Sequence, residues 1–100
     1  MPARTRKAAP RSPPSRVIER VQVGVRIEKR LVKVLKGLAE ALDLTLADLL
    51  EGMVLHALEN APPFQPSTLR RIQKLREIYG LDLGPGDAHR LREVADEPSP

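Results

Sequence analysis

Hydrophobic and polar residues alternate along the chain between positions 21 and 27, and this alternation predicts a short β-strand. The apolar positions carry β-branched side chains, namely Val21, Val23, Val25 and Ile27. A period of two places alternate side chains on opposite faces of a strand, and β-branched residues favour that conformation. We therefore expect a half-buried strand whose polar face carries Gln22, Gly24 and Arg26.

The spacing of apolar residues becomes helical from Leu31 onward. Apolar residues fall three and four positions apart, with lysines between them, as in an amphipathic helix. The expected buried face carries Leu31, Val34, Leu35, Leu38, Ala39 and Leu42.

A second helix is predicted to begin at Thr45, whose hydroxyl group can cap it. Asp48 lies three positions later and forms a short-acid variant of the capping box. The helix should end by Asn60, because the two prolines that follow cannot extend it. Its apolar stripe carries Leu46, Leu49, Leu50, Met53, Val54, Ala57 and Leu58.

The C-terminal part predicts a third helix, with Ser67 as its cap and Gly80 as its end. Two weaker helical turns are expected between positions 87 and 94. The third helix leaves three uses open: it covers the core, joins a higher oligomer on DNA, or binds a protein partner through residues 67–94. Core packing is the commonest use of an apolar stripe; this one carries Leu69, Ile72, Leu75 and Ile78.

The N-terminal residues predict a disordered basic arm over residues 1–18. Positions 1–16 hold five cations, four prolines and no acid, so they cannot bury enough apolar surface to fold. An inert solubilising leader is the alternative interpretation. The domain that folds is expected over residues 19–60, followed by a linker and helical extension over 61–94 and a disordered tail over 95–100.

The composition excludes several kinds of functional site and favours an anionic partner. The 100 residues include no cysteine, which excludes disulfides and thiolate sites, and the net charge of +4 favours nucleic acid ahead of an acidic membrane as partner. His56 and His89 lack zinc-site spacing, and the chain shows no Ser-His-Asp set or glycine-rich phosphate loop. We expect no metal, no cofactor and no enzyme activity. No apolar run predicts a signal peptide or a membrane span, so we expect a soluble, cytoplasmic, nucleoid-associated protein.

One strand without a partner poses a physical problem, because unpaired backbone groups are costly when buried. The chain shows no second strand pattern, so pairing with the same strand of another copy is the economical solution. We therefore expect an obligate homodimer. Its core is expected to hold Val21, Val23, Val25, Ile27, Leu31, Val34, Leu35, Leu38, Leu49, Leu50, Met53 and Val54.

The order of strand, helix, short turn and capped helix in VQVGVRIEKRLVKVLKGLAEALDLTLADLLEGMVLHAL resembles the ribbon-helix-helix family of the MetJ and Arc type. The resemblance covers about two fifths of the chain. It implies a mainly α fold with one short strand, built as an intertwined homodimer with an intermolecular two-stranded antiparallel ribbon, plus an extra C-terminal helix. Glu28 stands where relatives often have proline, and Asp43 where many have glycine.

The resemblance also implies a DNA site. Gln22, Gly24 and Arg26 would enter the major groove, although Gly24 offers no side chain to read a base. Arg suits guanine, Gln suits adenine, and the helix start at Thr45 and Leu46 favours a phosphate. Further phosphate contacts are expected from Arg20, Lys29, Arg4, Arg6, Lys7, Arg11 and Arg16.

The resulting hypothesis is a sequence-specific transcriptional repressor that binds double-stranded DNA. An antitoxin or a plasmid-partition protein that binds centromere repeats would use the same chemistry. A protein-interaction adaptor that binds no DNA is the alternative from another class. A helix-turn-helix module is a further alternative, but it leaves the alternating segment unexplained.

Overall fold

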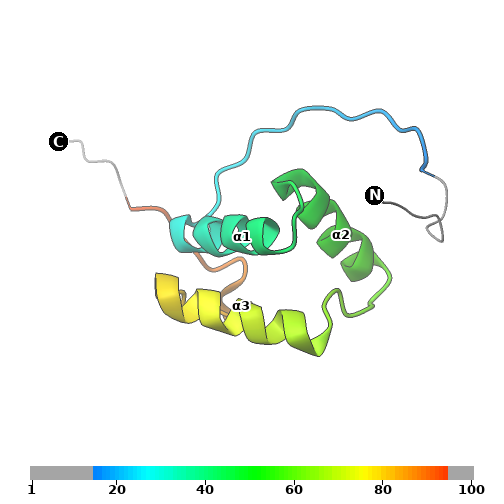
Figure 1. The fold of residues 1–100 in the computed structure, drawn as a ribbon. Helices are drawn as coiled ribbons and strands as arrows, with labels where there is room; N and C mark the ends of the chain where they lie inside the picture. The colour runs from blue at the N-terminus through cyan, green and yellow to red at the C-terminus, as the bar shows by residue number, and fades with distance from the viewer. Residues whose placement is uncertain (1–14, 95–100) are drawn as a thin grey trace.

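The fold is known from a computed structural model that describes residues 15–94, and the regular secondary structure in this range is helical. The helices are α1 (Lys29–Ala41), α2 (Leu46–Leu58) and α3 (Pro66–Tyr79), followed by one 3₁₀ turn, η2 (Pro85–Asp87). Figure 1 shows α1 and α3 side by side, with α2 beyond the end of α1. None of the helices within residues 15–94 combines the length and the apolar character needed to cross a membrane.

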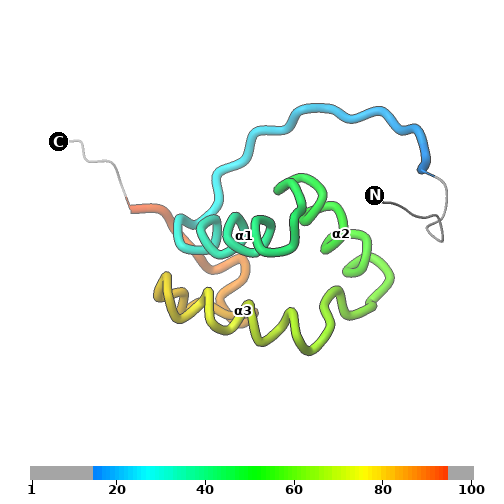
Figure 2. The backbone as a smooth tube through the Cα atoms, in the orientation of Figure 1, coloured from blue at the N-terminus to red at the C-terminus, as the bar shows by residue number. Residues whose placement is uncertain are grey.

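The expected ribbon-helix-helix fold is wrong, because residues 15–94 contain no strand and therefore no strand pair. Residues 15–28, which we call the strap, follow a long open path over the helices (Figure 2). No backbone hydrogen bond among the described residues involves positions 15–27. The alternation in the sequence identified a segment outside the helices, but pairing requires a second strand, and the described chain supplies none.

The strap residues that were expected in the core of the homodimer are exposed within the single chain. Their exposed fractions run from 40% for Ile27 to 81% for Val21, so they pack against little else in the chain. Without a paired strand to hold one face against the helices, alternation alone does not bury a side chain. The four residues concerned are Val21, Val23, Val25 and Ile27.

Helix α1 begins where Glu28 caps it. The Glu28 carboxylate accepts a hydrogen bond of 2.9 Å from the Leu31 amide, and this bond lowers the pKa of Glu28, with Arg30 adding to the effect. The helix ends in a tight turn in which Asp43 takes a left-handed φ of 60°. Asp tolerates this conformation better than most residues, which explains how it replaces the glycine common in such turns.

The predicted cap of α2 is confirmed. The Thr45 hydroxyl oxygen accepts a hydrogen bond of 3.0 Å from the Asp48 amide, and the helix ends at Leu58. Helix α3 begins two residues earlier than expected, because Gln65 rather than Ser67 occupies the cap and Pro66 takes the first helical position.

Gly80 ends α3 in the left-handed conformation, as predicted. The helical turns expected between positions 87 and 94 are wrong. The chain forms only η2 there, and the residues after it have no helical structure up to position 94. Pro85 and Gly86 favour a short turn over a helix.

The core lies where α1 meets α2 and α3. Leu38 is its centre with 2% exposed, and Leu35, Ala39 and Leu49 pack around it. The sequence predicted these residues correctly. Of the three uses that it left open for α3, core packing is the one seen in the structure, where Ile72 and Leu75 contact this cluster. Leu31, Leu50 and Met53 are partly buried against the same cluster, Val34 is buried, and Val54 is 53% exposed.

Helices α1 and α3 run antiparallel. Lys33, near the start of α1, lies over the Tyr79 ring at the end of α3, 5.8 Å from its centroid. At the middle of α1, a Cβ on Gly37 would come within 3.0 Å of the Leu75 side chain. Arg30, near the start of α1, links this helix to the residues that follow α3 by donating hydrogen bonds to the Gly80 carbonyl at 2.9 Å and to Asp82 at 3.0 Å.

Candidate nucleic-acid interface

Charge is divided unevenly along the chain. Residues 1–36 hold eleven lysines and arginines against two acids, whereas residues 37–100 hold six against eleven. The cations therefore belong to the arm, the strap and the start of α1, and the acids to the remaining helices and the tail. A polyanion should therefore be attracted mainly to the N-terminal third of the chain.

The strap presents its three candidate base-reading positions to solvent. Gln22, Gly24 and Arg26 are exposed, and no atom lies within 4 Å of the position a Gly24 Cβ would occupy. Their freedom from the core leaves them able to approach a groove. Gly24 also lets the backbone approach a ligand closely.

Two of the three strap arginines that were assigned to DNA are paired within the chain. Arg26 donates two hydrogen bonds to Glu93, from Nε to Oε2 at 2.7 Å and from Nη2 to Oε1 at 2.8 Å. Arg20 donates two to Glu51 at 2.8 and 2.9 Å, and its Nη2 lies 3.8 Å from Asp48 Oδ1. These hydrogen bonds lower the pKa of Glu51 and of Glu93 and raise the pKa of both arginines.

The sequence did not assign a role to Glu51 or Glu93. Glu51 is a surface position of α2, and Glu93 follows the last turn within residues 15–94, so neither stands in a motif. The uneven charge distribution was the only signal in the sequence for these ion pairs. Acids concentrated in one part of a chain attract the cations concentrated in another.

The start of α1 offers fewer free cations than the sequence suggested. Lys29 is exposed, whereas Arg30 is held by Glu28, Asp82 and the Gly80 carbonyl, and Lys33 lies over Tyr79. Lys29 therefore remains a candidate phosphate contact beside the strap.

The start of α2 is less suited to an anion than expected. Thr45 is exposed, Leu46 is partly buried, and the Asp48 amide is already satisfied by the Thr45 hydroxyl. The carboxylates of Asp48 and Glu51 lie in the first two turns and repel a phosphate unless Arg20 compensates for them. The structure thus brings Arg20, rather than Lys29 or Arg26, to the helix start that was predicted to hold a phosphate.

Four of the expected phosphate contacts and the tail lie outside residues 15–94. These contacts are Arg4, Arg6, Lys7 and Arg11; Arg16 lies within the described range and is exposed.

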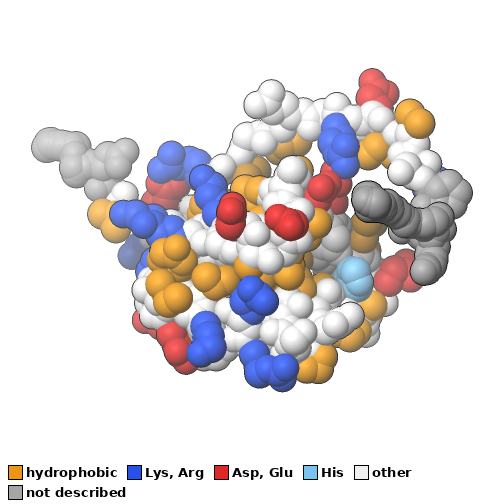
Figure 3. Space-filling model, in the orientation of Figure 1, with side chains coloured by type: hydrophobic (Ala, Val, Ile, Leu, Met, Phe, Trp, Pro, Cys, Tyr) orange, Lys and Arg blue, Asp and Glu red, His pale blue; other side chains and the backbone are white. Residues whose placement is uncertain are grey.

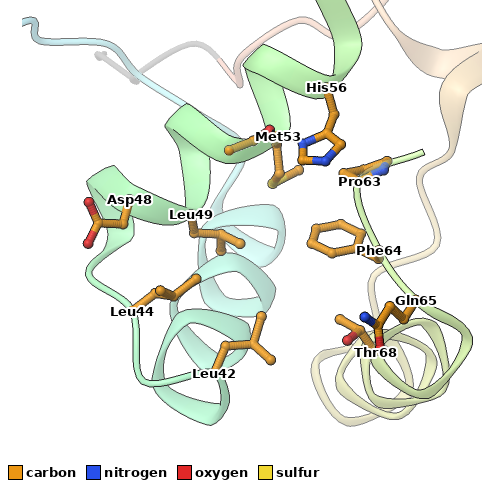
Figure 4. A pocket seen from close by; sticks show the side chains of 11 residues that line it. Leu42, Leu44, Asp48, Leu49, Met53, His56, Pro63, Phe64, Gln65 and Thr68 are labelled. Carbon is orange, nitrogen blue, oxygen red and sulfur yellow. Dashed lines mark hydrogen bonds between the residues drawn. The ribbon is translucent and has the colours of Figure 1, made fainter. Parts of the chain in front are cut away.

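A cavity of about 340 Å³ lies where the end of α1, α2 and the start of α3 meet. Leu42, Leu49, Met53 and Phe64 make most of its wall apolar (Figure 4). The His56 Nδ1 at its rim lies 2.7 Å from the Gly52 carbonyl oxygen, which occupies that nitrogen. The described residues contain no group of three or more side chains able to hold a metal ion.

The outer stripe of α2 is apolar and open. Val54 is 53% exposed and Leu58 is 75% exposed, and both follow Leu50 at helical spacing. The space-filling view shows further hydrophobic side chains at the surface between charged ones (Figure 3). An open stripe on a helix is a docking surface or a cost to solubility.

Comparisons with models of protein families, with curated proteins and with solved structures gave no match to this chain. The function is therefore argued from the residues and their arrangement.

Proposed function

We propose that the chain is a DNA-binding protein, acting as a transcriptional repressor and as a homodimer. The observation that carries the proposal is the concentration of positive charge in the sequence of the arm, the strap and the start of α1, together with the exposure of Arg20, Arg26 and Lys29 in the described part. Phosphate neutralisation supplies most of the affinity of such a surface for DNA. An antitoxin or a plasmid-partition protein would bind DNA through the same surface.

The strap supplies the contact in this proposal. Arg26 and Gln22 reach the bases, while Arg20, Lys29 and the arm cations hold phosphates. The contact is made by an open segment, as in proteins whose basic arms follow a groove, and uses no paired strands.

The homodimer is proposed through the outer stripe of α2. Only six apolar residues are buried among the described 80, a small core for a chain of this size. A second copy packing its own α2 against this stripe would bury Val54 and Leu58 of both chains and present two straps to one duplex.

The test is selection of bound sequences from a random duplex library, followed by affinity measurements at several salt concentrations. The expected result is an enriched motif that is lost in a Gln22→Ala, Arg26→Ala variant. Arg26→Ala alone should weaken binding to the selected site by about tenfold to a hundredfold. Arg70→Ala on the outer face of α3 removes the same charge and serves as the matched control.

The open α2 stripe also favours a second candidate, an adaptor that binds a protein and no DNA. Salt separates the two functions. A DNA-binding chain loses affinity linearly in log salt with a slope of about 0.9 for each phosphate neutralised. An adaptor shows no salt-dependent binding to duplex DNA at all, and that result would reject the proposal.

A further inference from the structure

Two ion pairs join the strap to the helical body, one near the middle of the strap and one close to the start of α1. Arg20 binds Glu51 of α2, and Arg26 binds Glu93 of the C-terminal segment. Residues 91–94 lie beside residues 25–29, since both segments line one shallow hollow. The two ion pairs are the polar links between positions 15–27 and the body that the described residues contain.

Both links occupy the donors that DNA would need. The guanidinium fork matches a carboxylate and a phosphate or a guanine edge with the same pair of N–H groups. In the structure, Nε and Nη2 of each arginine already donate to one glutamate. DNA cannot take the same pair of donors while the glutamate keeps them.

Both links are also weak enough to exchange. The Arg26 and Glu93 side chains are 80% and 64% exposed, and those of Arg20 and Glu51 are 56% and 43% exposed. Exposed pairs of this kind contribute little and are screened by salt. The tail continues the acidic character, because Asp96 and Glu97 follow Glu93 in the sequence.

We infer that Glu51 and Glu93 act as internal competitors of DNA, holding the strap against the body and lowering its affinity for the duplex. The inference rests on the proposed DNA-binding function and adds a regulatory device to the same site. Binding proceeds by exchange: each arginine releases a carboxylate as it takes a phosphate or a base. A modification, partner or ion that occupies either glutamate would free the strap and tighten DNA binding.

The first test compares DNA affinities of three variants by fluorescence anisotropy. Glu51→Gln and Glu93→Gln each remove one competitor, while Glu77→Gln, an exposed position of α3, makes the same change in net charge without touching the strap. Each competitor variant should bind about two- to fivefold more tightly than Glu77→Gln, and the double variant by about the product. Equal affinities for all three variants would overturn the inference.

A second measurement needs no DNA. Spin labels at Val23→Cys and Leu91→Cys report the distance between strap and C-terminal segment, and the chain has no other cysteine. Labelled chains are diluted with unlabelled ones to isolate distances within one chain. The distribution should be narrow in the parent and broad in the Glu51→Gln, Glu93→Gln double variant.

The DNA affinities and the spin-label distances test the proposed DNA-binding function and the strap contacts separately. A distribution that broadens in a chain that never binds DNA would support the strap contacts and reject the proposed function. DNA binding with unchanged distances and unchanged affinity would reject the strap contacts and leave the function standing.

Discussion

Two glycines in helix interiors allow the packing of α3 on α1 to be tested with one kind of substitution. Gly52 in α2 has open space around it, with no atom beyond its own stretch of helix within 4 Å of an added Cβ. Gly37 in α1 faces α3, where an added Cβ would lie 3.0 Å from Leu75 Cδ2 and 3.8 Å from the Tyr79 ring. Alanine improves helix propensity equally at both positions, so the difference between the variants reports the contact with α3.

The magnitudes follow from the two environments. Gly52→Ala should stabilise the fold by about 1 kcal/mol, the usual gain for glycine to alanine inside a helix. Gly37→Ala has the same gain, but Leu75 must shift by a few tenths of an ångström, and crowding a packed contact costs about 1–3 kcal/mol. We expect Gly37→Ala to be neutral or destabilising and to lie at least about 1 kcal/mol below Gly52→Ala.

The assay is urea unfolding followed by circular dichroism at one fixed protein concentration, because self-association changes apparent stability. A difference of about 1 kcal/mol corresponds to about 4–8 °C in Tm for a chain of this size. Equal stabilisation by both substitutions would refute the reasoning, since it would mean that α3 does not press against α1 at Gly37.

Four further outcomes are expected. Thr45→Ala removes the cap of α2 and should lower the free energy of unfolding by about 1 kcal/mol in urea titrations; a change below about 0.3 kcal/mol would contradict this role. Leu38→Ala empties the centre of the core and should cost about 2–5 kcal/mol, measured in the same way, whereas a neutral result would place Leu38 outside the core. Val54→Asp should shift sedimentation from dimer to monomer, while Leu69→Asp, an equally exposed position on α3, should not; dimers in both variants would exclude the α2 stripe as the interface. Because hydrogen bonds from Arg26 lower the pKa of Glu93, their pair should persist at neutral pH and break only as the pH falls below the ordinary glutamate range of about 4.3; spin-label distances that broaden near pH 7 would contradict this sign.

The helices were predictable because their determinants are local. The Thr45 cap, the Gly80 stop and the apolar face around Leu38 depend on residues within a few turns, and each is found where the sequence placed it. The helix expected after position 87 was wrong, because two or three apolar residues there could not outweigh the preceding proline and glycines.

The conformation of the strap could not be predicted, because it depends on residues far away in the sequence. Alternation describes a single segment, whereas a strand is a relation between two segments, and nothing in positions 21–27 specifies a partner within the chain. The pairs from Arg20 to Glu51 and from Arg26 to Glu93 span 31 and 67 residues. Contacts at such separations depend on how the helices lie. The sequence therefore indicated the cations of the candidate site but not the carboxylates that bind them.

The position of Tyr79 gives the protein a built-in spectroscopic reporter. It is the only tyrosine of the chain, tryptophan is absent, and its ring lies at the α1–α3 contact beneath the Lys33 ammonium. Its emission and near-ultraviolet dichroism therefore follow the docking of α3 without any label, while far-ultraviolet dichroism follows total helix content. A tyrosine transition that precedes the loss of helicity would reveal that α3 undocks as a unit before α1 and α2 unfold.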